Sequence, residues 1–437
     1  MKHSRLHRPL LAPIVCALFA GTVAQAQTTQ PAVTDGTTTT VIQEEYTGHP
    51  KQASLGGSEQ HVLPERAGLL KMGPITLIEP AAKDLEKWTS EEFRLDLGFR
   101  ATFGFQQASG GPGERTAAEQ DYRIYGTWHA INWEEDKKGS AGNVYFRVEY
   151  RDQLFTKIPP AFLNQSLGTL YGTTYGFDQH DPALVQLYYE QFLADGALRL
   201  RAGKIDPDDY FSLGRWADDY RYFMNTLFSF TPGANHPSGG LGFNAQWYIN
   251  PEWTLTAGFS DVQGRKTESG FTTFFEDFDL FEAVDVTWSP TFDNLGKGNY
   301  RFGVEHRDDS ERKGTEEDLG IYINIDQEIA KDIAPFMRFW YGQGDATGVK
   351  MSLAGGLGME NCFGRPGDAF GFGFGADWPD DDIGAARNVE YAAEIFYRFQ
   401  LTRAIQWSID LQAIIDPALD PDHDFAGVFG TRLLIEF

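Results

Sequence analysis

Residues 93–106 read FRLDLGFRATFGFQ, and apolar and polar side chains alternate along the whole stretch. Every second position is phenylalanine, leucine or alanine, whereas the other positions carry arginine, aspartate, glycine, threonine or glutamine. Successive side chains of a β-strand point to opposite faces, so this period of two predicts a strand with one apolar and one polar face. The chain ends in the same way, because Leu433, Ile435 and Phe437 share one face of the closing GTRLLIEF.

About sixteen segments of the chain show this alternation. A soluble sandwich also alternates, but its buried faces are not usually matched by so many long strands with arginine and glutamate opposite. Lipid outside and water inside explain both faces. The fold is therefore predicted to be all-β, a transmembrane antiparallel β-barrel of about 16 strands with long extracellular loops and short periplasmic turns. The predicted strands are 93–106, 121–133, 143–153, 184–194, 196–205, 240–249, 252–261, 279–288, 299–307, 318–327, 333–342, 349–359, 368–377, 388–401, 406–415 and 427–437.

The connections between these strands alternate in length, as expected if both termini lie on one side of a membrane. Turns at 250–251, 330–332 and 402–404 fall on the predicted inner side. The outer side takes the segments 154–183, 206–239, 262–278, 308–317 and 416–426. The exceptions are 134–142 and 289–298, which are long for inner turns, and 343–348, which is short for an outer loop.

The N-terminus divides into two further segments. Residues 1–26 combine basic residues, an apolar stretch and Ala24-Gln25-Ala26, the pattern of a secretory signal peptide with its cleavage site. Residues 27–92 are rich in Thr, Gln and Gly at first and are predicted to be a flexible leader with a short helix from about Pro80 to Glu91. The barrel domain is predicted to occupy 93–437.

Composition excludes several other classes of protein. The net charge of −25 argues against a nucleic-acid partner, because phosphate binding needs a basic face. Outside the N-terminus no run approaches the roughly 18 to 20 apolar residues of a membrane-spanning helix. Cys16 lies in the signal segment, so Cys362 alone remains and no intramolecular disulfide is expected.

Three stretches of the chain resemble the carbohydrate-selective porins of the OprB family. They are GKIDPDDYFSLGRWADDYRYFMN with the following PSGGLGF turn, GRPGDAFGFGFGADW, and the C-terminal segment from EYAAEIFYRFQLT through a D-P-rich loop to GTRLLIEF. The chain departs from the family before the first strand, where a GDWGG-type sequence is absent. The resemblance implies a monomeric or homotrimeric barrel in the bacterial outer membrane that passes monosaccharides such as glucose by diffusion.

Charged residues on the polar faces of the strands are the candidate pore lining. Rows of arginine and carboxylate can hold each other in place and present donors and acceptors to sugar hydroxyls. Pairing between strands, without contact to solute, is the alternative for any one residue. The candidates on strands are Arg100, Arg147, Glu149, Arg199, Arg201, Arg301, Glu394 and Arg398.

The outer loop 206–239 supplies the remaining candidates, Trp216, Asp218, Asp219 and Arg221. The loop is long enough to fold into the lumen and narrow it. Its aromatic rings could stack on the C–H face of a pyranose while its charged groups bind hydroxyls. A loop that packs on itself at the rim is the alternative, and shortening 210–230 would distinguish the two.

Two motifs have residues that could form a catalytic or a metal site. NHPSGG at 235–240 places His236 two residues before Ser238, a spacing similar to that of outer-membrane phospholipase, but Pro237 and the following glycines favour a turn into a strand. DPALDPDHDF at 416–425 has carboxylates suitable for calcium but lacks the glycine and terminal glutamate of an EF-hand loop. We therefore expect no catalytic residue, no cofactor and no metal.

The leading interpretation is a passive, sugar-preferring porin and not an enzyme. A general or anion-selective porin stays open, because inward arginines could favour anions locally. A barrel that serves as scaffold for an outer-membrane enzyme or adhesin is the third reading. The expected partners are sugar solutes, outer-membrane lipid and lipopolysaccharide, and the barrel assembly machinery. The terminal Phe437 resembles the signal by which that machinery recognises outer-membrane barrels.

Overall fold

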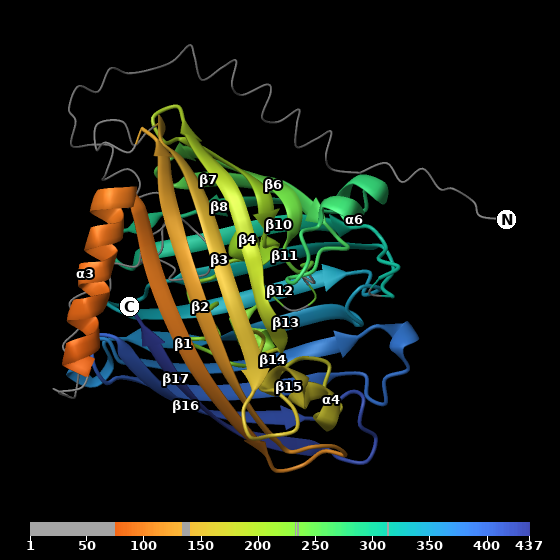
Figure 1. Ribbon diagram of the computed structural model, residues 1–437. Helices are drawn as coiled ribbons and strands as arrows, with labels where there is room; N and C mark the ends of the chain where they lie inside the picture. The colour runs from red at the N-terminus through yellow and green to blue at the C-terminus, as the bar shows by residue number, and fades with distance from the viewer. Residues whose placement is uncertain (1–74, 133–139, 232, 234–235, 313) are drawn as a thin grey trace.

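A closed antiparallel β-barrel of sixteen strands forms the body of the protein (Figure 1). The computed structural model describes residues 75–437 except 133–139, 232, 234–235 and 313. The strands are β1 Leu95–Ala108, β2 Thr116–Ile131, β3 Gly142–Gln153, β4 His180–Leu193, β5 Leu198–Ile205, β6 Gly240–Asn250, β7 Trp253–Asp261, β8 Leu280–Trp288, β10 Gly296–Arg307, β11 Asp318–Gln327, β12 Ile333–Gly342, β13 Val349–Glu360, β14 Ala369–Pro379, β15 Glu390–Gln400, β16 Ile405–Ile415 and β17 Phe425–Glu436.

The last strand closes the barrel against the first. Arg100 lies opposite Glu436 in the register of β1 and β17. The amide of Phe99 donates to the carbonyl of Phe437 at 3.0 Å, and the amide of Phe437 donates back at 2.9 Å. Closure leaves no unpaired strand edge, which is the condition for a sheet to cross a hydrocarbon layer.

The predicted strands are confirmed, with small corrections at their ends. The first strand begins at Leu95 and not at Phe93, because Phe93 ends a helix and Arg94 turns the chain with a φ of 57°. β2 and β4 begin about four or five residues earlier than predicted, at Thr116 and His180. The first residues of these two strands lack large alternating apolar side chains, so the sequence pattern does not predict them as strand.

Burial alternates along the strands as predicted. In contrast to a soluble protein, the apolar side chains are on the exposed face and the charged side chains are on the buried face. Large apolar side chains on the outer face are exposed, with Leu411 at 53% and Phe429 at 41% of their surface. Charged side chains on the inner face are buried, with Arg100 and Arg398 at 2% and 3%. An apolar outside and a polar inside are what lipid and water on the two sides of a barrel wall require.

The two ends of the barrel differ. The short-turn end carries the turns 194–197, 251–252, 328–332 and 401–404, together with the start of β1 and the end of β17. The long connection predicted at 289–298 lies at this end as well, and it is ordered by a two-residue strand, β9 Thr291–Phe292, that pairs with Gly296 and Lys297. The predicted turn at 134–142 lies mostly outside the described residues.

The opposite, long-loop end carries the segments 154–179, 206–239, 262–279, 308–317 and 416–424. Three short helices lie in them, α4 Leu163–Leu167, α5 Thr226–Ser229 and α6 Phe271–Glu276. Short 3-10 turns at Pro160–Phe162, Pro207–Asp209 and Asp381–Ile383 lie at the same end, whereas the 3-10 turn Cys362–Gly364 connects β13 to β14 at the short-turn end.

A longer helix, α3 Ile75–Phe93, precedes the barrel. It contains the short helix predicted from about Pro80 to Glu91 and extends beyond both of its ends. Figure 1 places α3 beside the end of the barrel where the C-terminus lies. Among the described helices, α3 included, none has the length and apolar character needed to span a membrane. The expected signal segment and most of the expected leader lie outside the described residues.

Candidate functional site: the polar interior of the barrel

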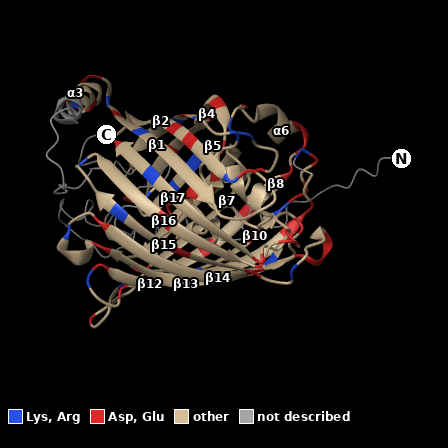
Figure 2. Ribbon diagram, turned by 90° about the horizontal axis from the view of Figure 1, so that it is seen from below, with Lys and Arg blue, Asp and Glu red and all other residues tan. Residues whose placement is uncertain are grey.

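All the charged and aromatic residues predicted to line the interior are buried inside the barrel or in the loop within it. Each is less than a tenth exposed; they are Arg100, Arg147, Glu149, Arg199, Arg201, Trp216, Asp218, Asp219, Arg221, Arg301, Glu394 and Arg398. Figure 2 shows basic and acidic positions along the strands as well as on the loops. The structure does not gather them at one point, and they form several clusters at different places on the wall.

The first cluster is a ladder of arginines and carboxylates on β2 and β3. Glu149 lies 2.9 Å from Arg147 Nε, 2.9 Å from Arg151 Nη2 and 3.3 Å from Arg123 Nε. Asp121 takes the other side of the ladder, at 3.1 Å from Arg123 Nη2 and 3.1 Å from Arg151 Nε. Opposite charges at these distances offset one another, so the buried ladder is held without a large net charge.

A second cluster joins loop 206–239 to the barrel closure. Glu436 of β17 lies between two arginines: Arg100 of β1 donates to its Oε1 at 3.0 Å, and Arg221 of the loop donates to its Oε2. Arg221 also donates to Asp218 at 3.0 Å. The penultimate residue of the chain therefore holds the tip of the loop against the wall.

The backbone of the same loop is fixed by a carboxylate from β15. Glu394 accepts hydrogen bonds from the amides of Met224 and Asn225 at 2.7 and 2.9 Å. These amides directly precede the first turn of α5, whose N-cap is Asn225: the Asn225 side chain accepts from the amide of Leu227 at 2.9 Å. Glu394 thus serves as an anchor for the loop in this structure.

Aromatic residues of the loop pack against the far wall. Trp216 is fully buried, and its Nε1 donates to the carbonyl of Ala334 on β12 at 3.1 Å. The ring of Tyr220 lies 4.3 Å from the guanidinium of Arg123, and its hydroxyl donates to Asp121 at 3.0 Å. Loop 206–239 leaves the wall between β5 and β6 and contacts β2, β12, β15 and β17, so it lies across the lumen and not on the rim.

Loop 154–179 also enters the interior, and sequence reasoning assigned it no role. The ring of Tyr175 stacks on Phe230 of loop 206–239, with centroids 4.7 Å apart and planes within 6°. Its hydroxyl donates to Asp208, and 42% of its surface stays exposed. The amide of Gly176 donates to Asp219. Tyr175 carried no pattern that separates it from other loop tyrosines, because its role depends on contacts between two loops distant in sequence.

Three other predicted residues pair chiefly with neighbouring strands, although Arg201 also lies 4.7 Å from the ring of Tyr210 and Arg301 donates to the carbonyl of Tyr210 at 3.5 Å. Arg199 and Arg201 of β5 both donate to Glu190 of β4, the latter at 2.8 Å. Arg301 of β10 pairs with Asp285 of β8 at 2.5 Å. These are pairs between neighbouring strands, the alternative considered for the inward arginines.

His236, weighed above as a base for Ser238, lies between two carboxylates. Its Nδ1 is 2.7 Å from Asp208 Oδ1, and its Nε2 is 3.2 Å from Glu305 Oε2. Burial alone would lower the pKa of His236, but Glu305 and Asp208 more than offset this and raise it to about 10. A cationic imidazole with both nitrogens engaged joins the loop to β10 and is not available as a general base.

Two carboxyl groups of loop 206–239 have raised pKa values. Burial and the neighbouring Asp208 raise the pKa of Asp206 to about 6, although Arg147 opposes the shift. Burial and the neighbouring Asp218 raise the pKa of Asp219 to about 6. The pKa of Asp218 itself is lowered, because Arg221 and Arg100 outweigh the effect of its burial. Neighbouring acids in one loop therefore titrate in different ranges of pH.

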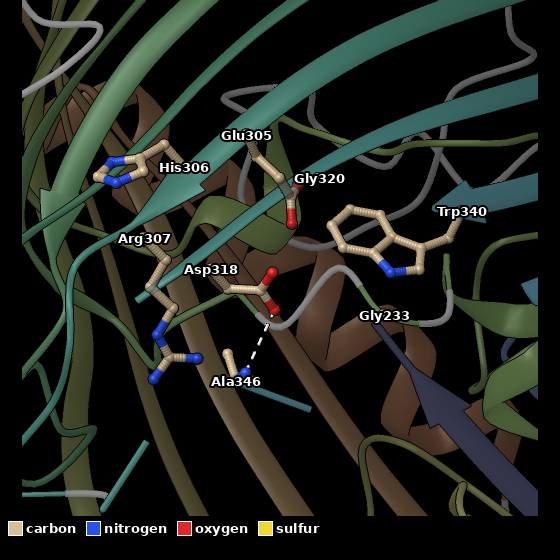
Figure 3. A pocket seen from close by; sticks show the side chains of 8 residues that line it. All are labelled: Gly233, Glu305, His306, Arg307, Asp318, Gly320, Trp340 and Ala346. Carbon is tan, nitrogen blue, oxygen red and sulfur yellow. Dashed lines mark hydrogen bonds between the residues drawn. The ribbon is translucent and has the colours of Figure 1, made fainter. Parts of the chain in front are cut away.

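A small cavity lies near the long-loop end, between β10, β11, β12 and the loop (Figure 3). Glu305, Arg307, Asp318 and Trp340 are among its lining residues, and Asp318 accepts from the amide of Ala346 at 3.2 Å. Its volume is about 10 Å³, which suits a single water molecule and is far below the size of a hexose. We therefore assign it no role in solute binding.

Acidic residues outside the interior were considered as metal ligands. In the 416–425 segment Asp420 accepts from His423 at 2.7 Å, and Asp424 pairs with Arg387 at 2.6 Å, so these carboxylates already have protein partners. Carboxylates of Asp345, Asp380 and Asp382 come within 4.8 Å of one another. Acidic clusters of this kind are common on protein surfaces, and this one carries no proposal.

The sixteen-strand barrel with a charged interior and inward-folded loops defines a porin. The sequence profile described as "Carbohydrate-selective porin, OprB family" matches residues 163–437. The chain belongs to this family. The matched residues include loop 206–239 and every strand from β4 to β17.

Relatives and solved structures agree with this assignment. Porin AaxA of Chlamydia abortus is 25% identical in an alignment of 289 residues that covers 62% of this chain and 60% of the relative. Porin AaxA of Chlamydia pneumoniae is 25% identical in an alignment of 290 residues that covers 62% of each chain. The chain thus spans about three fifths of the length of these relatives. A high-pH structure of Pseudomonas putida OprB has a TM-score of 0.67 at 17% identity and covers 81% of this chain and 97% of its own. That likeness shows the shared fold.

Proposed function

We propose that the protein is an outer-membrane porin through which monosaccharides such as glucose diffuse passively into the periplasm. Membership of a carbohydrate-selective family supports the class of solute. The alternation of exposed apolar and buried polar residues supports a place in a bilayer. Under this proposal the surrounding partners are membrane lipid and lipopolysaccharide, and the barrel is a monomer or a homotrimer.

One observation carries the proposal: loop 206–239 crosses the lumen and is anchored on the far wall. Glu394, Glu436 and Ala334 hold it through hydrogen bonds at three separate places. A pore narrowed by a fixed loop selects solutes by size and by the groups that line the gap. An unanchored loop would leave a wide, non-selective channel.

The chemistry at the constriction suits a neutral polyhydroxylated solute. Arginines and carboxylates there are paired with each other, as in Glu149 with Arg147 or Arg221 with Asp218, so the local field is partly neutralised. Such pairs still offer charged donors and acceptors that can replace the water around a sugar hydroxyl. Tyr175 adds a partly exposed aromatic face on which a pyranose could stack. We propose that the predicted lining residues act together in this way.

We further propose the domain plan given by the sequence. Residues 1–26 would direct export, 27–92 would form a leader whose end is α3, and 93–437 would form the pore domain. The terminal Phe437 would be the signal read by the barrel assembly machinery. The engaged imidazole of His236 supports a porin rather than a phospholipase-like enzyme. Lipid hydrolysis by the purified protein would contradict this part.

Liposome swelling with the purified protein tests the solute class. Glucose is expected to enter much faster than a disaccharide or an amino acid of similar concentration. Arg100→Met, which removes one partner of Glu436 at the closure, should change the ratio of these rates. Leu411→Ala, on the outward face of β16, is the matched control and should leave the ratio unchanged. Equal rates for all three solutes would refute sugar preference.

A general or anion-selective porin is the second candidate, and the row of buried inward arginines favours it. The two candidates differ in ion permeation, because fixed positive charge in the lumen favours anions. The reversal potential in a salt gradient measures this directly. A strong preference for chloride together with slow glucose entry would replace the first candidate with the second.

A further inference from the structure

Two large apolar residues of helix α3, Leu85 and Trp88, point away from the protein. Among its described side chains Leu85 is 51% exposed and Trp88 is 53% exposed, whereas Thr89 is buried at 5%. An amphipathic helix that packs on a soluble protein buries its large apolar residues and leaves small polar ones outside. The arrangement in α3 is the reverse, so another apolar medium must cover Leu85 and Trp88.

The side of α3 next to Leu85 and Trp88 is charged and solvated. Asp84, Lys87 and Glu91 are exposed, and Lys87 pairs with Glu91 at 3.8 Å one turn later. Residues 85 and 88 lie on one face because they are three positions apart, and 87 and 91 lie on the adjacent face with Asp84 at the border. The exposed Glu92, four positions after Trp88, interrupts the apolar face near the barrel end of the helix. An apolar stripe beside a charged stripe is the pattern of a helix that lies at a boundary between lipid and water.

The exposed tryptophans of the barrel identify where that boundary lies. Within residues 75–437, gaps excepted, four tryptophans have large exposed surfaces: Trp88, Trp128, Trp253 and Trp407. Trp128 is near the end of β2, Trp253 begins β7 and Trp407 is near the start of β16, so all three lie at the short-turn end. Tryptophan prefers the interface between hydrocarbon and water, and a ring of it marks that level on a membrane barrel.

Trp88 is linked to this belt along the chain, through Phe93 at the end of α3 and the start of β1. Its ring lies 5.1 Å from the ring of Phe93, which is 53% exposed. Two residues later Leu95 pairs with Trp128 in the register of β1 and β2. Figures 1 and 2 both place α3 outside the strands at this end. The apolar stripe of the helix is therefore continuous with the lipid-facing surface of the barrel.

We propose that α3 is a membrane-interface helix, with Leu85, Trp88 and Phe93 embedded among the phospholipids of the periplasmic leaflet and its charged stripe in water. This inference rests on the proposed outer-membrane placement. Lipid is the occupant that the belt favours over a second copy of the chain, because the belt residues are spread over β2, β7 and β16 and not gathered on one side. The helix would then fix the orientation of the segment that enters the barrel.

Spin-label accessibility in bilayers of phosphatidylethanolamine and phosphatidylglycerol tests the proposal on the full chain. In a background with both cysteines changed to serine, labels are placed through Trp88→Cys on the apolar stripe and Lys87→Cys on the charged stripe. Phe429→Cys on the outward face of β17 gives the lipid reference. The ratio of collision rates with oxygen and with a water-soluble nickel chelate is expected to be several-fold higher at 88 than at 87, and close to that at 429.

Two results would overturn the inference. The first is an equal, water-like ratio at positions 87 and 88, and the second is a short label-to-label distance between copies at 88, which would assign the stripe to an oligomer contact. Glucose flux is measured in the same vesicles. If glucose enters the vesicles but the label at position 88 is exposed to water, the helix inference alone is refuted. If the label at position 88 is embedded in lipid but glucose does not enter, the proposed transport function alone is refuted.

Discussion

Replacing Trp216 by alanine tests whether loop 206–239 sets the size of the pore. The indole is fully buried in a cluster with Phe223, Phe336 and Phe396, and it lies flat on Gly358, where an added Cβ would be 2.2 Å from the ring. Loss of a buried tryptophan costs about 3–5 kcal/mol. Loss of the hydrogen bond from its Nε1 to the carbonyl of residue 334 costs about 1 kcal/mol more.

This loss of free energy destabilises the loop in its position inside the barrel and not the barrel itself, because the strands keep their own hydrogen-bonded ladder when the side chain is removed. A total of about 4–6 kcal/mol, at 1.4 kcal/mol for each factor of ten, raises the ratio of displaced to seated loop by about three to four orders of magnitude. Trp216→Ala is therefore expected to spend more time at a higher conductance level in planar bilayers. The rate of disaccharide entry should rise relative to that of glucose.

The control is Trp407→Ala on the outer face of β16, where the same change of residue is made at a side chain that is 38% exposed. It should alter insertion but leave conductance and the ratio of solute rates unchanged. Folding is checked for both variants by the heat-dependent shift of the barrel on a gel. A folded Trp216→Ala protein with wild-type conductance and solute ratio would refute the assignment of the loop as the constriction.

Three further results are expected. Shortening 210–230 should raise single-channel conductance, and an unchanged value would contradict a role for the loop in narrowing the pore. Asp206 and Asp219 have pKa values of about 6, so they lose their negative charges as the pH falls from 7.5 to 5 while ordinary carboxylates stay ionised. The preference of the pore for cations, measured from the reversal potential, should therefore fall over this range. It should fall less in the Asp219→Asn variant, which has only one of the two titrating groups. Deletion of Phe437 should reduce the yield of inserted barrel and leave the conductance of the inserted fraction unchanged; normal insertion would argue against a terminal assembly signal.

The strands could be predicted from the sequence because lipid imposes a rule on every one of them. A membrane-facing position must be apolar and its neighbours face water, so the alternation around Phe99 or Leu411 repeats in each strand whatever the solute. Closure could be predicted as well, since an open edge in hydrocarbon would leave backbone groups without partners. The strand ends beyond the hydrocarbon obey no such rule, and the predicted starts of β2 and β4 are wrong by several residues for that reason.

The interior could be predicted only in its composition. Alternation places Arg100, Arg147 and Glu394 on the inner face, but it does not say which partner each one meets. Glu394 binds backbone amides of a loop about 170 residues earlier in the chain, and Tyr175 stacks on a ring about 55 residues away. Such contacts depend on how two loops fold inside the barrel, which no local pattern records.

The last strand links closure of the barrel to the shape of the pore. Ile435 of β17 and Phe437, which directly follows the strand, lie on its outward side, and Glu436 between them faces inward and meets both Arg100 and Arg221. Because β17 must pair with β1 before Glu436 reaches Arg100, the anchor for the tip of loop 206–239 exists only in the closed barrel. A loop seated earlier would bury Arg221 with Asp218 as its acidic partner but without the further bond to Glu436 that ties this pair to the wall. The same alternation that lets the chain end on an apolar face in lipid thus supplies, one residue earlier, the group that holds the constriction in place.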